Sequence, residues 1–187
     1  MSSIEFTLHP FNQSNTPSPP LSVKGAISLQ DNKINVLFRM LGEINNIFFP
    51  KLTQRPSRKD ELWNTTCCEL FVAKSGQPGY WEYNLSPSHD WAIFKFSNYR
   101  TAKTDDLSIT EIDINTKIDK NSEFELNTIL KLPGALIGQN LEIGVSSVIQ
   151  NTLGEISYYA LSHPVEKPDF HDRNCFTIHI NAEQINE

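Results

Sequence analysis

The sequence predicts an all-β fold, a β-sandwich of jelly-roll character built from about eleven short antiparallel strands. Two observations support this prediction. Apolar and polar residues alternate with a period of two in many short segments, and turn residues separate these segments at intervals of about 8–12 residues. No segment keeps apolar residues at helical spacing over three turns, so no long amphipathic helix is expected.

The composition is that of a globular protein that forms one domain over residues 1–187. A chain of this size buries roughly 70% of its unfolded surface, so its core needs no metal or disulfide. The apolar fraction is 39%, the charged fraction is 20% and the net charge is -6. No basic block exceeds two residues, so we expect neither nucleic acid nor a membrane surface as a partner. The oligomeric state is left open.

The cysteines and the N-terminus predict a cytoplasmic protein. The three cysteines, Cys67, Cys68 and Cys175, are an odd number, which indicates reduced thiols rather than a disulfide framework. Cys67 and Cys68 point to opposite faces of a strand, so we interpret them as small buried residues rather than joint metal ligands. The first residues, MSSIEFTLHPF, lack the features of a signal peptide, and no segment has the ~20 apolar residues of a membrane span.

The N-terminal part predicts three strands. The first is IEFTL, followed by a proline-rich loop over residues 9–20. Residues 21–29 and 33–41 then form a hairpin across the turn QDN, with Ile34, Val36, Phe38 and Met40 on one side of the second strand. A long loop over residues 42–59 follows. Loops beside a sheet are a common place for binding residues.

The segment Arg58–Arg100 contains all three tryptophans and predicts three strands joined by turns: CCELFVA, YWEYNLS and WAIFKF. The middle strand divides by parity. Its residues Trp81, Tyr83 and Leu85 face one way, and we assign them to the core. Tyr80, Glu82, Asn84 and Ser86 face the other way and present hydrogen-bonding groups. This division predicts a sheet that holds a polar ligand on one face.

The C-terminal part predicts the remaining strands. They lie over residues 107–118, with Ile112 and Ile114 in register, and over residues 124–132, 141–150, 156–163 and 175–180. A turn with one helical turn in it is expected at residues 132–140. A loop at residues 164–174 separates the last two strands.

Motifs for catalysis are absent from the sequence, since there is no G-x-S-x-G, no phosphate-binding glycine loop and no H-E-x-x-H. Two sets of residues leave an enzyme open as an alternative. Glu69 and Glu82 are carboxylates on neighbouring strands, as glycosidases require, although such a pair is more often two independent groups. The loop from His163 to His171 carries aspartates, but its spacing matches no zinc pattern, and loop histidines usually bond to turn backbone.

We expect no metal, haem or other cofactor. The methionines are Met1 and Met40, and Met40 lies on the apolar side of its strand. The sequence therefore offers no suitable methionine as an axial haem ligand.

Carbohydrate binding accounts better for the mixture of aromatic and polar residues. A pyranose has an apolar face and a rim of hydroxyls, which suits a flat ring beside charged hydrogen-bonding groups. Stacking that hides ~100 Å² contributes roughly 2.5 kcal/mol, so one ring needs polar partners to give measurable affinity. The candidate rings are Trp63 and Trp91. The candidate partners are Arg58, Glu69, Asn84 and Arg100.

Three segments resemble a known family: ELWNTTCCELFVA, YWEYNLSPSHDWAIFKFSNYR and YYALSHPVEKPDFH. They are similar to the DOMON-like domains related to family 9 carbohydrate-binding modules, above all to a small stand-alone bacterial group. The resemblance implies a β-sandwich with a ligand site on one sheet. It implies that Trp63 and Glu69 correspond to the pair that grips the sugar and Asn84 to a polar position in the next strand. Phe170 or His171 lies in the region of the family's second clamping tryptophan.

The function predicted from the sequence is non-catalytic binding of a carbohydrate or similar polar small molecule on one sheet of the sandwich. Two alternatives stand beside it. The chain is an interaction module whose aromatic patch of Trp63 and Trp91 is covered by a partner chain, or it is an enzyme that uses Glu69 and Glu82 or the loop from His163 to His171.

Overall fold

The computed structural model describes residues 3–11, 21–119 and 122–182. Among these residues it has no α-helix, and no helix in this part of the chain is long and apolar enough to cross a membrane. The all-β prediction is confirmed. Of the loop predicted over residues 9–20, the first two residues extend the first strand, and residues 12–20 lie outside the description.

Twelve strands form the sheet system. In chain order they are β1 (Ile4–Pro10), β2 (Ser22–Gln30), β3 (Lys33–Leu41), β4 (Cys67–Lys74), β5 (Tyr80–Leu85), β6 (Trp91–Phe96), β7 (Thr104–Asp105), β8 (Ile114–Asp119), β9 (Glu123–Lys131), β10 (Leu141–Gln150), β11 (Ile156–Ala160) and β12 (Ile178–Ile180). Short 3-10 helices are η2 (Ile44–Asn46), η3 (Leu62–Asn64), η4 (Gly134–Leu136) and η5 (Arg173–Cys175).

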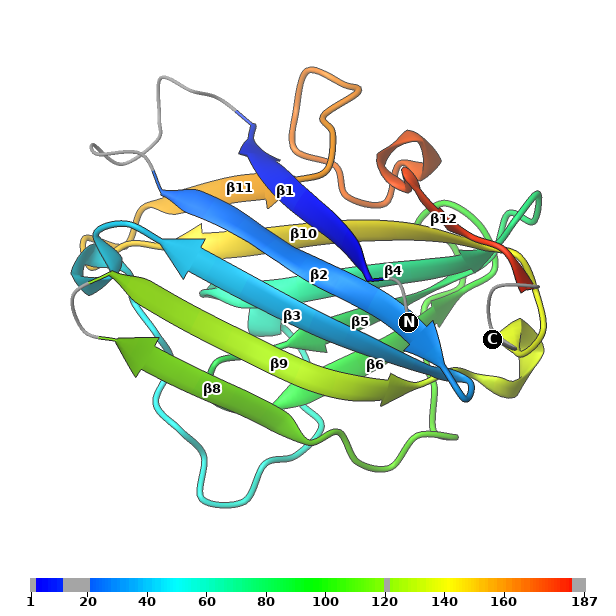
Figure 1. Cartoon of the computed structure of the whole chain (residues 1–187), viewed down its shortest axis with the longest axis horizontal. Helices are drawn as coiled ribbons and strands as arrows, with labels where there is room; N and C mark the ends of the chain where they lie inside the picture. The colour runs from blue at the N-terminus through cyan, green and yellow to red at the C-terminus, as the bar shows by residue number, and fades with distance from the viewer. Residues whose placement is uncertain (1–2, 12–20, 120–121, 183–187) are drawn as a thin grey trace.

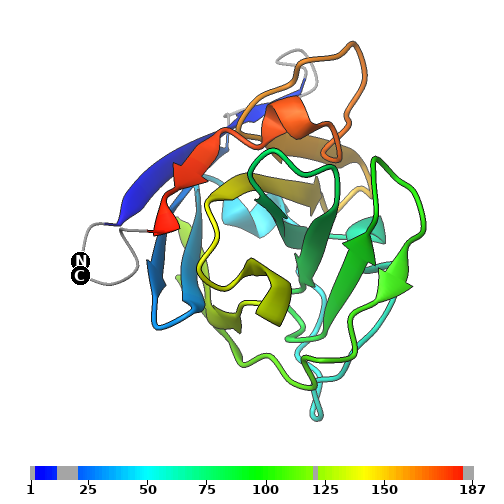
Figure 2. The ribbon, with the colours of Figure 1, turned by 90° about the vertical axis from the view of Figure 1, so that its right-hand side faces the viewer.

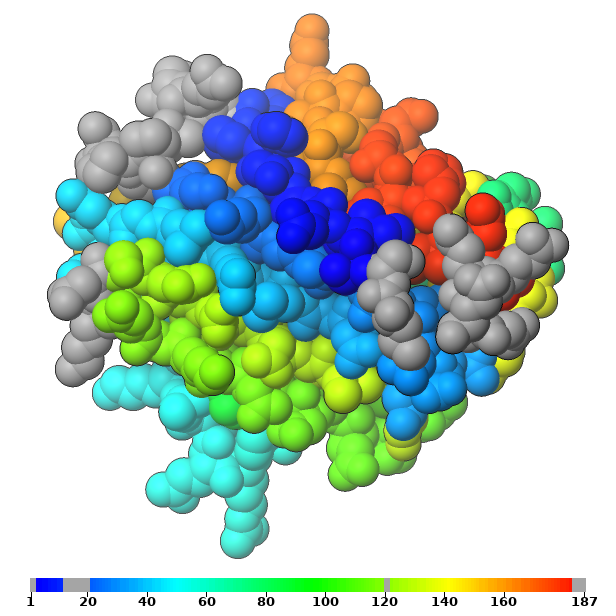
Figure 3. Space-filling view, viewed as in Figure 1, coloured from blue at the N-terminus to red at the C-terminus, as the bar shows by residue number. Residues whose placement is uncertain are grey.

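The strands make two layers. The front sheet has the order β1-β2-β3-β9-β8, and the back sheet has the order β7-β6-β5-β4-β10-β11, with β12 paired to one end of β10. The two layers lie one behind the other in Figure 1 and curl around a shared interior in Figure 2. Strand β1 joins them, because its first residues pair with β2 and its last two pair with β11. Figure 3 shows the outer face of the front sheet, covered by side chains of β2, β3 and β9.

The interior between the sheets is built by the predicted alternation. On β3, Ile34, Val36, Phe38 and Met40 are at most 2% exposed. The turn before this strand has Asp31 and Asn32 at positive φ, the backbone that suits a two-residue hairpin. On β5, the inward assignment of Trp81, Tyr83 and Leu85 is confirmed, and all belong to the main core.

A second, smaller apolar cluster lies on the outer face of the back sheet. It consists of Phe71, Ala73, Tyr80, Ala92, Phe94, Phe96, Cys175 and Phe176. The segment after β11 carries η5 across this face, and Arg173 ties it down by hydrogen bonds to Glu142 of β10 and to the Gln77 carbonyl. Both faces of β4 and β5 are therefore buried. The outer face of the back sheet is capped at one end only, which leaves room for a cavity beside the cap.

Three predicted strands are clearly shorter than expected. The strand predicted over residues 107–118 begins only at Ile114, the strand predicted over residues 156–163 ends at Ala160, and the strand predicted over residues 175–180 begins at Ile178. In the last case Asp172 accepts a hydrogen bond from the Asn174 backbone at 2.9 Å and starts η5 instead. The helical turn expected near residue 134 is confirmed as η4.

Close packing of β2 against β3 predicts a large effect of a methyl group at Gly25. A Cβ there would lie 1.8 Å from the Leu37 carbonyl oxygen and 2.6 Å from the Phe6 ring. We expect Gly25→Ala to lower the free energy of unfolding by about 1–3 kcal/mol or more, because backbone must move to relieve the overlap. Urea denaturation followed by circular dichroism measures this.

Gly134→Ala is the matched control, because a Cβ at that position meets no atom within 4 Å. It should be neutral or stabilising by up to about 1 kcal/mol, through the lower entropy of the unfolded chain. Equal effects of the two substitutions would contradict the close approach of the strands.

Candidate functional site

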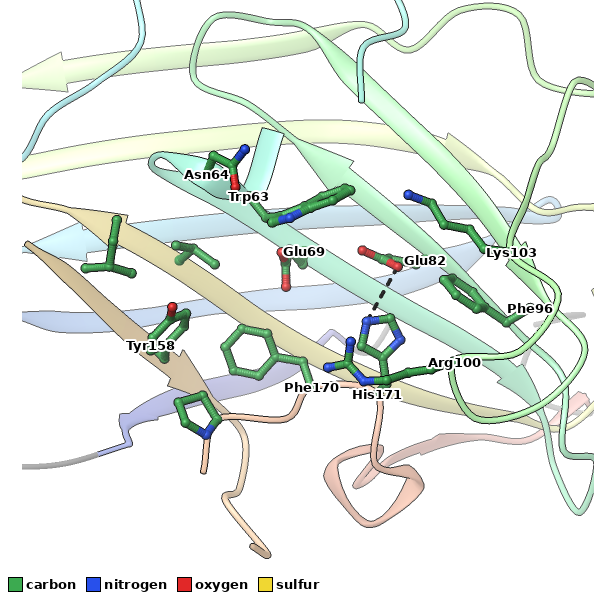
Figure 4. Close-up of a pocket in the computed structure, with 13 residues that line it drawn as sticks. Trp63, Asn64, Glu69, Glu82, Phe96, Arg100, Lys103, Tyr158, Phe170 and His171 are labelled. Carbon is green, nitrogen blue, oxygen red and sulfur yellow. Dashed lines mark ion pairs between the residues drawn. The ribbon is translucent and has the colours of Figure 1, made fainter. Parts of the chain in front are cut away.

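A cavity of about 480 Å³ opens on the outer face of the back sheet, beside the apolar cap. Figure 4 shows its residues, which come from strands β4, β5, β6, β10 and β11 and from three connecting segments. The lining side chains are Trp63, Asn64, Glu69, Glu82, Phe96, Arg100, Lys103, Val148, Ile156, Tyr158, Pro168, Phe170 and His171.

Two carboxyl groups occupy the cavity and are almost fully buried. Glu69 of β4 is 3% exposed and Glu82 of β5 is 5% exposed. They are diagonal neighbours, because Glu69 pairs with Asn84 and Glu82 pairs with Phe71 in the β4–β5 register. Ser146 of β10 donates a hydrogen bond to Oε2 of Glu69 at 2.8 Å. The Asn84 amide donates to Oε1 of Glu82 at 2.8 Å.

Burial and proximity keep these two acids from ionising freely. Burial and the neighbouring Glu82 raise the pKa of Glu69 to about 8. Burial also raises the pKa of Glu82, against the hydrogen bond from Asn84 and the more distant charges of Lys103 and Arg100. Near neutral pH the Glu69 carboxyl therefore holds its proton.

His171 approaches the acids from the loop over β4 and β5. Its Nε2 lies 3.9 Å from Oε2 of Glu82, the contact dashed in Figure 4, and its Nδ1 lies 2.8 Å from the Tyr80 hydroxyl. Burial and the nearby Arg100 lower the pKa of His171 to about 4. The imidazole is therefore neutral at physiological pH, and its contact with Glu82 is not an ion pair there.

Two cations stand at the rim, and each has an acidic partner. Arg100 donates to Oδ1 of Asp169 at 2.9 Å, and its side chain is 51% exposed. The Lys103 ammonium lies 3.2 Å from Oδ1 of Asp60. Arg100 has a positive φ of 49°, a backbone conformation that aims its amide at the Tyr80 hydroxyl, 3.2 Å away.

Aromatic rings form the walls. Trp63 of η3 is half-buried and packs edge-to-face on Phe94, with ring centroids 6.0 Å apart. Across the cavity, Phe170 meets Tyr158 edge-to-face at 6.0 Å, and Phe96 stacks on Tyr80 at 4.8 Å. The cavity thus combines exposed ring surface with carboxyl oxygens.

Five of the residues predicted from the sequence meet at this cavity: Trp63, Glu69, Arg100, Phe170 and His171. They come from segments as far apart as η3 and the loop before η5. The cavity thus brings together residues of ELWNTTCCELFVA and of YYALSHPVEKPDFH, which lie far apart in the sequence.

Three predicted residues do not line the cavity. Trp91 is 3% exposed and lies in the main core, because it pairs with Leu85 on the inward side of the back sheet. The expectation that it offers a stacking ring, or an exposed patch with Trp63, is wrong. Asn84 is fully buried and serves as the donor that holds Glu82 rather than as a ligand contact.

Arg58 is the third. Its guanidinium lies 4.5 Å from the centroid of the Trp91 ring and donates to the carbonyls of Ile93, Asp106 and Ile109. It therefore clamps the segment after β7 to β6, away from the cavity. The expectation that it flanks a ligand is corrected.

Several lining residues were not among the predicted ligand contacts. The sequence indicates Glu82 only as half of a carboxylate pair, although it shares the parity of Asn84. Phe96 lies with Phe94 on the outer side of β6, but the pattern alone does not show it, because residues on both sides of this strand are apolar. Lys103 and Tyr158 carry no local signal, because only the tertiary arrangement brings them to the cavity.

His163 and the three cysteines do not line the cavity. His163 bonds through Nε2 to the His9 carbonyl oxygen at 2.8 Å and packs on Phe11. Cys67, Cys68 and Cys175 are free and buried, and burial raises the pKa of each thiol. Within the described ranges, no group of three or more histidine, cysteine, aspartate or glutamate residues is arranged to hold a metal ion.

No protein-family model matches the chain, and no curated protein matches it. Solved structures do. A candidate carbohydrate-binding protein from Bacteroides uniformis ATCC 8492 superposes with a TM-score of 0.65 at 14% identity, over 92% of this chain and 84% of that chain. This likeness shows that the two proteins share the β-sandwich fold.

Two family 9 carbohydrate-binding modules from Caldicellulosiruptor kristjanssonii are also similar, at 14% identity each. The one in complex with glucose has a TM-score of 0.42, over 75% of this chain and 66% of that chain. The one in complex with cellotriose has a TM-score of 0.47, over 84% of this chain and 72% of that chain.

The raised pKa of Glu69 predicts that stability falls as pH rises. The folded protein retains a proton that the unfolded chain releases near its ordinary pKa of 4.5, so this stabilisation is complete below that pH and is lost toward about pH 8. His171 acts in the opposite sense, but only between its folded pKa of about 4 and its ordinary 6.5. Above about pH 6.5 His171 no longer affects the stability, so of these two groups only Glu69 still lowers it as the pH rises.

We expect the free energy of unfolding to fall by about 1–2 kcal/mol between about pH 6.5 and about pH 8.5. Glu69→Gln should flatten most of this decline, because it removes the titrating group and the like charge beside Glu82. Urea denaturation at a series of pH values measures both slopes. The same slope in the variant and the parent would contradict the assignment.

Proposed function

We propose that the protein binds a carbohydrate, without chemical change, in the cavity lined by Trp63, Glu69 and Glu82. The observation that carries the proposal is that a half-buried indole and two buried carboxyl groups line the same cavity. Tryptophans are otherwise core residues in this chain, as Trp81 and Trp91 are.

The chemistry of the cavity suits a sugar ring. The C–H face of a pyranose packs on a flat indole, and its hydroxyls need acceptors and donors that are already oriented. Carboxyl oxygens of Glu69 and Glu82 accept from hydroxyls, and Arg100 at the rim donates to them. Oriented groups bind more tightly because less conformational entropy is lost on association.

A solved structure of the same fold and a motif in the sequence also support the proposal. The Bacteroides uniformis protein of the same fold is described as a candidate carbohydrate-binding protein. Trp63 and Glu69 stand in the order and spacing that the resemblance to family 9 modules implies for the residues that grip the sugar. A relationship to the DOMON-like domains is part of this proposal.

Truncation of the indole tests the proposal. A glycan array selects the sugars, and isothermal titration calorimetry then compares the parent with Trp63→Ala. We expect the variant to bind at least about tenfold more weakly, since a tenfold loss corresponds to about 1.4 kcal/mol and a stacked ring contributes more than that.

Phe48→Ala is the matched control, since this ring is 44% exposed and does not line the cavity. It should leave the affinity unchanged. Absence of binding to any sugar at up to tens of millimolar would overturn the proposal.

A second candidate function is acid–base catalysis on a sugar. It is favoured by a proton donor and a neutral acceptor in one cavity, Glu69 with a pKa of about 8 and His171 with a pKa of about 4. Incubation with nitrophenyl glycosides distinguishes the two functions. Release of nitrophenol that is abolished in Glu69→Gln would establish catalysis, and no release would leave binding.

A further inference from the structure

Each of the two carboxyl groups in the cavity accepts a hydrogen bond from the described residues on only one of its two oxygens. Oε2 of Glu69 has its donor in Ser146, and Oε1 of Glu82 has its donor in Asn84. Within the described part of the chain, no donor bonds to the other oxygen of either group, and His171 at 3.9 Å from Oε2 of Glu82 is beyond hydrogen-bond reach. Both side chains are more than nine-tenths buried, so these oxygens are directed at the cavity and not at bulk water.

The cations near the acids do not neutralise them. Arg100 pairs with Asp169, and Lys103 pairs with Asp60, so each rim cation already has a carboxylate of its own. The imidazole of His171 is neutral. If both acids ionise, the cavity therefore carries negative charge with no protein cation in direct contact. A buried pair of this kind is stabilised by a positive charge placed between its members.

The walls also suit a positive charge. The face of an aromatic ring attracts an ammonium group within about 6 Å of its centroid. This protein already uses its rings in that way, since the Lys103 ammonium lies 4.6 Å from the centroid of Trp63 and 3.7 Å from that of Phe94. The other side of the cavity has the rings of Phe170 and Tyr158. A neutral sugar would use the ring faces but would give the two acids no positive charge to pair with when they ionise.

We propose that the ligand is an amino sugar, a pyranose whose ammonium group pairs with Glu69 and Glu82 while its ring packs on Trp63. This inference rests on the proposed function and specifies the chemical class of its ligand. The ammonium supplies up to three donors, which match the two free carboxyl oxygens and leave one for water or a sugar oxygen. The apolar face of the ring accounts for the indole, and the remaining hydroxyls reach the rim.

Three closely related sugars test whether binding depends on the positive charge of the ligand. Calorimetric titration of the full chain at about pH 7 compares glucosamine with glucose, which has a hydroxyl in place of the amine, and with N-acetylglucosamine, whose amide is uncharged. We expect glucosamine to bind at least about tenfold more tightly than either, the typical size of one added charge-assisted interaction. Equal or tighter binding of glucose or N-acetylglucosamine would overturn the inference and leave the proposed function standing. If none of the three binds, both the inference and binding of these simple sugars are overturned.

Variants of Glu69 and Glu82 test whether these two acids cause the preference for glucosamine over glucose. Glu69→Gln and Glu82→Gln should each lower the ratio of glucosamine affinity to glucose affinity, because each removes one of the two carboxyl groups that pair with the ammonium while keeping the shape of the side chain. Glu5→Gln, an exposed glutamate on β1 outside the cavity, should leave the ratio unchanged. A ratio that is the same as in the parent in both cavity variants contradicts the pairing. Circular dichroism melting verifies that each variant is folded.

Proton release gives a readout that does not depend on variants. At about pH 6 the amine of the sugar is charged and the Glu69 carboxyl, facing Glu82 and Arg100, holds its proton. Pairing with the ammonium ionises this acid, so titrations in buffers of different ionisation enthalpy should report release of about one proton with glucosamine. Release of no proton would contradict direct contact between the ammonium and the acids.

Discussion

The site depends on one constraint, the period of two in the back sheet. Each of β4, β5 and β6 sends alternate side chains into the main core and the others to the outer face. The register between β4 and β5 then fixes Glu69 and Glu82 as diagonal neighbours on that outer face. A slip of one residue would exchange the acids with core side chains, which the apolar interior does not tolerate. The packing that stabilises the sandwich therefore also determines the position of the acids.

Connecting segments complete the cavity and bury the acids. The loop that carries His171 is held by hydrogen bonds of Arg173 to Glu142 and to the Gln77 carbonyl, and by the apolar cap around Phe176. This cover excludes water from one side of the carboxyl pair and raises its pKa values. Two buried acids with incomplete hydrogen bonding lower the stability of the folded state. Such an arrangement is typical of a site where a ligand supplies the missing partners.

The sequence predicts the fold through local alternation, and the same alternation predicts part of the site. It assigns Glu82 and Asn84 to one face of β5 and Trp81 to the other. On β6 the alternation is ambiguous, because Ala92, Phe94 and Phe96 on one side are all apolar, whereas Trp91 and Ile93 share the other side with Lys95. The sequence therefore does not show that Trp91 faces the core, which only the pairing of β6 with β5 determines. Arg58 and Lys103 are different. Their partners lie on segments that meet only in the tertiary structure, so no local pattern shows that one clamps a loop and the other faces the cavity.

The three tryptophans allow the most direct measurement of whether the cavity is the binding site. Each indole N–H gives one signal in a ¹H–¹⁵N correlation spectrum, and Trp81 and Trp91 lie in the core while Trp63 lines the cavity. On addition of sugar, the signal of Trp63 should shift progressively and those of Trp81 and Trp91 should stay in place. A sugar that binds without moving the Trp63 signal, or that moves the core signals instead, would contradict the account.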